Sequence, residues 1–211
     1  MVKIKICGIT CAQDATWAVN LGADFIGLNF FKDSPRKVSP QNAMEIIQQL
    51  PPFVSAAGVF VNEEQKELVK IARKLGLKMI QLHGDESPDY CRQLKEALPE
   101  AKIIKAFRIQ DEASLAPMSS FSEAADYFLL DAYVPEIPGG TGVTFNWELA
   151  VKAKELGKLV FLSGGLNPEN IQEAIEKVKP FAVDVCSGIE RSPKRKDYDK
   201  MKDFITKAKQ V

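Results

Sequence analysis

The chain has 211 residues, of which 45% are hydrophobic, and this is typical of one globular domain rather than a disordered or fibrous protein. Its 28 lysine and arginine residues balance its 28 aspartate and glutamate residues, so the formal net charge is zero. We therefore expect neither nucleic acid nor an anionic membrane as a partner, and a bound anion would need a local site.

The cysteines and the single histidine further limit the kinds of protein that this sequence can encode. The four cysteines, Cys7, Cys11, Cys91 and Cys186, form no C-x-x-C pair. The first ten residues lack the apolar core of a secretory signal, and no apolar run approaches the ~20 residues that cross a bilayer. These features predict a cytoplasmic protein with reduced thiols. The single histidine, His83, excludes a zinc site built from two or three histidines.

Short apolar segments alternate with longer amphipathic ones along the whole chain. The short segments are rich in valine, isoleucine, leucine and phenylalanine and show little alternation, which predicts strands buried on both faces of a parallel sheet. The eight segments cover residues 3–8, 25–30, 55–60, 79–83, 103–107, 127–131, 159–163 and 182–186.

The segments between these strands carry signals for the starts of helices. A capping box, in which two side chains bind unpaired backbone N–H groups, is predicted at Thr10 and Gln13. Three further starts place a capping side chain before a proline suited to the first helical position: Ser39-Pro40, Ser87-Pro88 and Asn167-Pro168. Asn62 and Asp111 can cap two others, and residues 197–209 predict a final amphipathic helix.

Eight strand–helix units in 211 residues give about 26 residues each, the size of a compact βα repeat. Such a chain can close into a barrel or remain an open, doubly wound sheet. Polar residues recur at the strand ends, glycine-rich segments follow the seventh and eighth strands, and no G-x-G-x-x-G follows the first. The sequence therefore predicts an α/β fold, a (β/α)8 TIM barrel formed as one domain by residues 1–211.

Two strand ends carry residues suited to proton transfer. Cys7 ends the first strand and would point toward the mouth of a barrel, where a thiolate could act as a base. From its position alone it could also be a small buried hydrophobic residue, as free cysteines usually are. Asp131 closes the apolar sixth strand, and burial favours the protonated form that a general acid needs. Asp131 could instead cap a helix or form an ion pair in a loop.

The glycine-rich segments after the last two strands are candidates for phosphate binding. Gly164 and Gly165 follow the seventh strand, and Ser187 and Gly188 follow the eighth. Glycine lets backbone N–H groups approach an anion closely, although it also makes ordinary strand–helix turns. Two such loops after the seventh and eighth strands favour a phosphate site.

Three further features lie near the same predicted mouth. Arg36, in a basic loop after the second strand, could bind a carboxylate through two parallel hydrogen bonds or could simply be solvated. His83 could face the pocket or be a hydrogen-bonded structural residue. Residues 135–142 form a glycine-rich loop that could close over a substrate or only be flexible.

Seven segments, in order and over essentially the whole chain, together resemble the phosphoribosylanthranilate isomerases of tryptophan biosynthesis. They are residues 5–10 (KICGIT), 58–62 (GVFVN), 81–84 (QLHG), 130–131 (LD), 139–142 (GGTG), 162–167 (LSGGLN) and 181–190 (FAVDVCSGIE). The chain departs from the family pattern at Cys186, where serine is more usual.

The resemblance implies an aldose–ketose isomerase that performs an Amadori rearrangement of N-(5′-phosphoribosyl)anthranilate to 1-(2-carboxyphenylamino)-1-deoxyribulose 5-phosphate. It implies that Asp131 protonates the ribose ring oxygen and that Cys7 removes the C2′ proton. Arg36 would hold the anthranilate carboxylate, while backbone groups around Gly164, Gly165, Ser187 and Gly188 would hold the phosphate. It implies a small phosphorylated substrate, no metal and no cofactor. Monomers and homodimers both occur among barrels of this size.

Other functions remain open at this point. A related phosphate-binding barrel could be a sugar-phosphate epimerase, although one histidine argues against a metal-dependent one. An indole-glycerol-phosphate synthase would need a catalytic lysine and glutamate, and Lys105 is a possible lysine without an obvious matching glutamate. A barrel that only binds a phosphorylated ligand would not need both Cys7 and Asp131.

Overall fold

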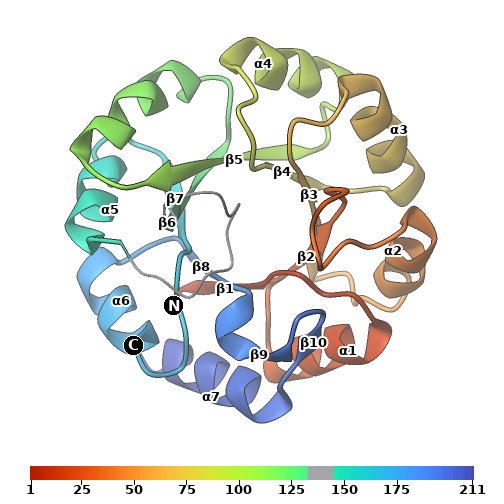
Figure 1. Cartoon of the computed structure of the whole chain (residues 1–211), viewed down its shortest axis with the longest axis vertical. Helices are drawn as coiled ribbons and strands as arrows, with labels where there is room; N and C mark the ends of the chain where they lie inside the picture. Colours follow the sequence, from red (N-terminus) through yellow and green to blue (C-terminus); the bar gives the residue numbers. More distant parts are fainter. Residues whose placement is uncertain (133–144) are drawn as a thin grey trace.

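Eight parallel strands close into one barrel in a computed structural model that describes residues 1–132 and 145–211 (Figure 1). The strands are β1 (Lys3–Ile6), β2 (Phe25–Asn29), β3 (Ser55–Phe60), β4 (Met79–Leu82), β5 (Lys102–Ile109), β6 (Tyr127–Ala132), β7 (Leu159–Leu162) and β8 (Ala182–Val185). Each strand pairs with the next, and β8 pairs with β1 to complete the ring. The predicted (β/α)8 barrel and its eight strands are confirmed.

Helices surround the strands on the outside of the ring (Figure 1). The α-helices are α1 (Ala12–Leu21), α2 (Pro40–Ile47), α3 (Gln65–Leu75), α4 (Pro88–Ala97), α5 (Trp147–Lys154), α6 (Ile171–Val178) and α7 (Tyr198–Lys209). Two 3-10 helices, η1 (Glu112–Phe121) and η2 (Ser187–Ile189), follow β5 and β8, and β9 (Glu190–Ser192) pairs with β10 (Arg195–Lys196) before α7. No helix within the described ranges is long and apolar enough to span a membrane.

Local capping signals located several helix starts correctly. The Ser39 side chain accepts a hydrogen bond from Asn42 N, and the Ser87 side chain accepts one from Tyr90 N, so both serine–proline starts are confirmed. Asp111 forms a capping box at the start of η1. In each case the capping side chain and its backbone partner are three residues apart, so the interaction needs no distant part of the chain.

Two other capping predictions were wrong because tertiary partners take the side chains. The Thr10 hydroxyl donates to Lys194 O at 2.6 Å, and α1 begins after Cys11 without a side-chain cap. Asn62 does not cap α3, since its Oδ1 accepts from Asp85 N at 2.7 Å. Asn167 does act as a cap, since its Oδ1 accepts hydrogen bonds from Glu169 N and Asn170 N, but α6 itself begins only at Ile171, after this turn.

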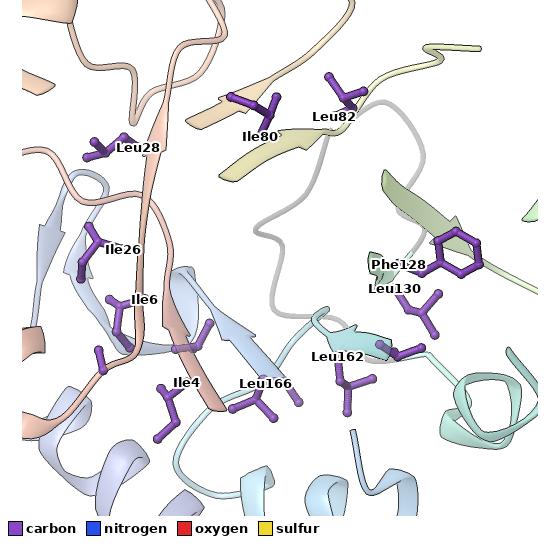
Figure 2. Packing of buried hydrophobic residues seen from close by; sticks show 14 of the residues in the cluster. Ile4, Ile6, Ile26, Leu28, Ile80, Leu82, Phe128, Leu130, Leu162 and Leu166 are labelled. Carbon is purple, nitrogen blue, oxygen red and sulfur yellow. The ribbon is translucent and has the colours of Figure 1, made fainter. Parts of the chain in front are cut away.

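The apolar residues form two layers separated by the barrel wall. Ile4, Ile6, Phe128 and Leu130 belong to a large cluster that includes residues of the surrounding helices, and Figure 2 shows them projecting from the strands. A smaller cluster fills the barrel interior, and it includes Phe161. Residues that alternate with the outer layer therefore point into the barrel, as the two-residue period of a strand requires.

This alternation brings polar groups into the barrel toward the carboxyl ends of its strands. On β1, Lys5 alternates with the outward Ile4 and Ile6, and it is fully buried. Its Nζ donates to Asp184 Oδ1 of β8 at 2.8 Å. A buried charge needs such a partner, because an isolated one would be far too costly to remove from water. Cys7 follows on the same face, two residues beyond Lys5.

Candidate active site

A cavity of about 310 Å³ opens at the carboxyl ends of the strands. Its lining includes four residues that the sequence analysis singled out: Cys7, Arg36, His83 and Asp131. They come from the ends of β1, β4 and β6 and from the loop after β2, so closing the barrel brings them together. This is the end at which barrel enzymes bind their substrates.

The two candidate proton-transfer groups approach the cavity from different sides. Cys7 follows β1 and Asp131 lies on β6, and β7 and β8 stand between these strands in the ring. A ligand in the cavity would therefore contact the thiol and the carboxyl group at separate points. This arrangement suits a reaction in which one group gives a proton and the other removes one.

Asp131 is buried, at 5% exposure, and its two oxygens have different neighbours. Oδ1 accepts a hydrogen bond from Ala132 N at 3.0 Å. Oδ2 lies 3.3 Å from His83 Nε2, and Gln81 Nε2 donates to His83 Nδ1 at 2.8 Å. Gln81 therefore places the histidine proton on Nε2, facing the carboxyl group. His83 lies in the pocket and contacts Asp131.

Cys7 is surrounded by groups that influence its ionisation. Interaction with the Cys186 side chain, and then burial, raise the pKa of Cys7, while the Lys5 ammonium opposes this. Interaction with Cys7 lowers the pKa of Cys186 to about 7 against the effect of burial, and Lys196 and Arg36 lower it further. The two thiols thus titrate as a pair, and the first proton that the pair loses belongs to both sulfurs.

Lys5 supplies a fixed positive charge beneath this pair. Burial alone would lower the pKa of Lys5, but Asp184 and Cys7 outweigh it and hold that pKa above the usual lysine value. Lys5 therefore stays protonated throughout the neutral range. A cation at this position favours negative charge on Cys7.

Arg36 is held in an ion-pair network and is not a solvated loop residue. Its Nε and Nη2 donate to the Glu190 carboxylate at 2.8 and 2.7 Å, and its side chain is 14% exposed. Lys196 Nζ donates to Glu190 Oε1 at 3.0 Å. Burial alone would raise the pKa of Glu190, but Arg36 and Lys196 hold it below the usual value. Glu190 occupies one edge of the guanidinium fork, so the Nη1–Nη2 edge is available for a second carboxylate.

The four residues predicted to bind phosphate lie next to the cavity but are not part of its lining. Gly164 and Gly165 both have positive φ, at 85° and 66°, and neither N–H donates to an acceptor in the described part of the chain. The second loop lies against the first, because a Cβ added to Gly188 would lie 2.1 Å from Leu166 O. Ser187 precedes Gly188 at the start of η2. The cavity lining reaches these loops at Ser163 and Cys186.

Gly164→Ala is expected to destabilise the protein more than Gly157→Ala. Both glycines have positive φ, which costs an L-residue about 1–2 kcal/mol. Only at Gly164 would the new Cβ also clash, at 2.4 Å from Ala132 N, and overpacking adds about 1–3 kcal/mol. Urea unfolding of the two variants measures the difference. Equal losses would show that the β6–β7 contact at Gly164 is not tight.

Several site residues were missed by reasoning from the sequence. Lys5, Asp184, Glu190 and Lys196 form the buried charge network around Cys7 and Arg36. One signal was available, because Lys5 is a charged residue between two isoleucines of an apolar strand and lies two residues before Cys7. No local sequence pattern distinguished Glu190 and Lys196 from charged residues on the surface.

The structure supplies the glutamate that the sequence did not pair with Lys105. Lys105 Nζ donates to Glu86 Oε2 and to Gly84 O, both at 2.7 Å. Lys105 is buried and alternates with Ile104, which belongs to the cluster inside the barrel. Its side chain therefore points out of the barrel and away from the cavity, where it cannot serve as the catalytic lysine of a synthase.

Two further expectations concern the same region. The glycine-rich loop at residues 135–142 lies outside the described residues. Within the parts of the chain that the structure describes, no group of three or more histidine, cysteine, aspartate or glutamate side chains is arranged to hold a metal ion.

Comparison with known proteins identifies the family. The model of the family described as N-(5′-phosphoribosyl)anthranilate (PRA) isomerase matches residues 4–207. The chain belongs to this isomerase family. An N-(5′-phosphoribosyl)anthranilate isomerase of Trichlorobacter lovleyi is 48% identical over 211 residues, covering 100% of both chains. One of Geobacter metallireducens is 50% identical over 209 residues, covering 99% of this chain and 100% of the relative.

Solved structures of phosphoribosylanthranilate isomerases have the same fold. The enzyme of Thermotoga maritima superposes with a TM-score of 0.92 at 42% identity, with 100% of both chains covered. A second structure, at 40% identity and a TM-score of 0.89 over 100% of both chains, holds reduced 1-(o-carboxyphenylamino)-1-deoxyribulose 5-phosphate. The resemblance on which the sequence analysis relied is confirmed, and so is the isomerase class.

Proposed function

We propose that this chain converts N-(5′-phosphoribosyl)anthranilate to 1-(2-carboxyphenylamino)-1-deoxyribulose 5-phosphate in tryptophan biosynthesis, with Asp131 as general acid and Cys7 as general base. The observation that carries the proposal is the placement of these two groups at one cavity, on strands that β7 and β8 separate in the ring. Membership of the isomerase family supplies the reaction.

In the first step, Asp131 gives its proton to the ribose ring oxygen, and the ring opens to a Schiff base. The His83 ring, which Gln81 contacts, lies beside Asp131, with Nε2 3.3 Å from Oδ2. The N–H of Ala132 holds the other oxygen at 3.0 Å. A carboxyl group held at Oδ1 keeps Oδ2 directed at its acceptor, and alignment is a large part of general-acid catalysis.

In the second step, Cys7 removes the C2′ proton, giving an enolamine that tautomerises to the ketone. After the Cys7–Cys186 pair has lost one proton, transfer of the remaining proton to Cys186 leaves Cys7 as the thiolate. Lys5 favours the negative charge at this place. The pair therefore supplies a base near neutral pH, although the interaction with Cys186 and burial raise the pKa of Cys7.

The ends of the substrate have separate candidate binding groups. The Nη1–Nη2 edge of Arg36 suits the anthranilate carboxylate, with Glu190 holding the guanidinium in place. The phosphate would lie against the backbone N–H groups of the loops at Gly164, Gly165, Ser187 and Gly188. The chain's own residues provide an acid, a base and both anion sites, so the chemistry calls for no metal and no cofactor.

Turnover by the purified protein tests the proposal. Freshly generated phosphoribosylanthranilate is mixed with the protein, and the loss of its fluorescence is followed together with formation of the ketose product. Rapid loss with stoichiometric product is expected. Binding of the substrate without turnover would overturn the proposal and favour a barrel that only binds a phosphorylated ligand.

Replacing Arg36 by glutamine is expected to raise KM about 10–150-fold, the equivalent of losing a charged hydrogen-bond pair worth about 1.5–3 kcal/mol. The effect should be confined to substrates that carry the carboxylate. Steady-state kinetics with the anthranilate substrate and with the analogue made from aniline measures this. Arg92→Gln is the matched control, because Arg92 lies exposed on α4. Equal losses on both substrates would contradict the role of Arg36.

The protein is proposed to form a homodimer. One solved structure, 39% identical with a TM-score of 0.88 and 100% of both chains covered, is of generated monomers of a phosphoribosylanthranilate isomerase from Thermotoga maritima that is described as dimeric. In this chain Phe53, in the loop after α2, is 77% exposed and would supply apolar surface to such an interface. Light scattering at several concentrations is expected to give twice the chain mass, and a monomer would overturn the proposal.

The protein is also proposed to act in the cytoplasm. All four cysteines are free in the structure, as reduced thiols would be in a reducing compartment. Fluorescence microscopy of a fusion protein is expected to show an even signal throughout the cell interior, and a peripheral signal would contradict the proposal.

A further inference from the structure

Cys7 and Cys186 lie at the ends of neighbouring strands. In the register of β1 and β8, Ile6 pairs with Val185, and Cys7 N donates to Val185 O at 2.9 Å. Each cysteine is the next residue after a member of this pair. Neighbouring strands lie about 4.8 Å apart, which falls inside the range of about 4.4–6.8 Å between the Cα atoms of a disulfide.

The side chains of the two cysteines share one environment. Both line the same cavity. The Cys186 sulfur lies close to Gly8, the residue after Cys7, because a Cβ added to Gly8 would lie 2.8 Å from Cys186 Sγ. Each thiol also shifts the pKa of the other. Neither Cys11 nor Cys91 lines the cavity.

Cys186 has the features of a reactive thiol. Lys196 Nζ lies 3.7 Å from the Cys186 sulfur. The Arg36 side chain is also close, because a Cβ added to Gly8 would lie 2.7 Å from Arg36 Cδ and 2.8 Å from the Cys186 sulfur. The two cations stabilise negative charge on Cys186, and interaction with Cys7 lowers the pKa of Cys186 in the same direction. Cys186 is also partly exposed, whereas Cys7 is buried. A thiolate that solvent can reach is the form of cysteine that oxidants attack.

We propose that Cys186 is a peroxide-reactive site that closes a reversible disulfide with Cys7. The proposal gives this chain a modification site next to the candidate base. Its consequence for activity rests on the proposed function, because the disulfide would remove the sulfur assigned as the base. Formation of the bond itself does not depend on that assignment.

The chemistry balances with a peroxide as the oxidant. The Cys186 thiolate attacks one peroxide oxygen, the O–O bond breaks, and hydroxide leaves, giving a sulfenic acid. The Cys7 sulfur then attacks the Cys186 sulfur, so that an S–S bond forms and the S–O bond breaks. The hydroxide that leaves takes up the Cys7 proton and becomes water. Two thiols and one hydrogen peroxide thus give one disulfide and two waters. The sulfurs lose two electrons, and the peroxide gains them.

The experiment treats the reduced, purified full chain with hydrogen peroxide and follows two readouts. Intact mass spectrometry is expected to show the loss of two hydrogen atoms, and peptide mapping without reductant is expected to link Cys7 to Cys186. Isomerase activity is expected to fall in parallel and to return with dithiothreitol. Each variant is compared with its own untreated rate. Cys186→Ser should form no link and should resist reversible inactivation, whereas Cys11→Ser should behave as the wild type does.

The mass readout separates failure of this proposal from failure of the proposed function. A Cys7–Cys186 link in a protein without isomerase activity would support the disulfide and overturn the function. Normal isomerase activity with no link, or with sulfinic acid as the first product, would overturn the disulfide. Reversible inactivation of Cys186→Ser at the wild-type rate would do the same. If that variant fails to fold, iodoacetamide labelling of the wild type decides, since Cys7 and Cys186 should lose reactivity together.

Discussion

Asp131→Asn is expected to lower kcat by about 10²–10⁴-fold, the range that one general acid contributes. The amide has the same shape as the carboxyl group, and its oxygen can still accept the hydrogen bond from Ala132 N. It has no proton of suitable acidity to give to the ribose ring oxygen. Ring opening, which the acid promotes, then becomes the slow step, and stopped-flow or steady-state fluorescence of the substrate measures the loss.

The matched control for this variant lies on the same segment of chain. Asp126, immediately before β6, accepts a hydrogen bond from Ile103 N at 2.8 Å, at the end of the barrel opposite to the cavity. Asp126→Asn should leave kcat near the wild-type value, although it can lower stability. Wild-type kcat in Asp131→Asn would remove Asp131 from the mechanism. A similar kcat loss in both variants would point to a general structural effect.

Cys7→Ser is expected to lower kcat by a similar factor of about 10²–10⁴, because a serine hydroxyl hardly ionises near neutral pH and cannot replace a thiolate as the base. The change is small in volume, and Cys7 is buried, so the fold should be retained. Cys11→Ser is the matched control, since Cys11 lies outside the cavity at the start of α1. Turnover that survives in Cys7→Ser would move the base elsewhere, with His83 the next candidate.

The pH profile of kcat/KM provides an independent check on this base. A base works in its deprotonated form, so the rate should rise with pH as the thiol pair loses its first proton, and it should fall as the pair becomes protonated. The pKa of Cys186, lowered to about 7 by its interaction with Cys7, places this change near neutral pH. In the Cys186→Ser variant, the rise of kcat/KM should move to higher pH. An unchanged profile would contradict the shared ionisation.

The order of strands and helices follows from patterns that are local in sequence. Each of the eight strands is a short apolar run, and the structure places all eight within two residues of their expected ends. The caps at Ser39 and Ser87 are equally local, because donor and acceptor lie three residues apart. Cys7 and Asp131 were found in the same way, as reactive groups at the ends of apolar strands, which a barrel gathers at one mouth.

The partners of these residues could not be read from local patterns. Arg36 and Glu190 are 154 positions apart, and Lys5 and Asp184 are 179 positions apart, so no short window contains either pair. Thr10 and Asn62 matched helix caps, but distant groups took their side chains.

The sequence by itself determined the fold class, the family and the positions of the two candidate catalytic groups. Only the tertiary structure decided which neighbours set the ionisation of these groups and which side chains fix the residues around them. Arg36 is fixed by Glu190, and the Cys186 and Lys5 side chains act in opposite directions on the pKa of Cys7. The physical reason is barrel closure. Pairing of β8 with β1 brings the two ends of the chain side by side, and burial then makes each charge depend on its neighbours.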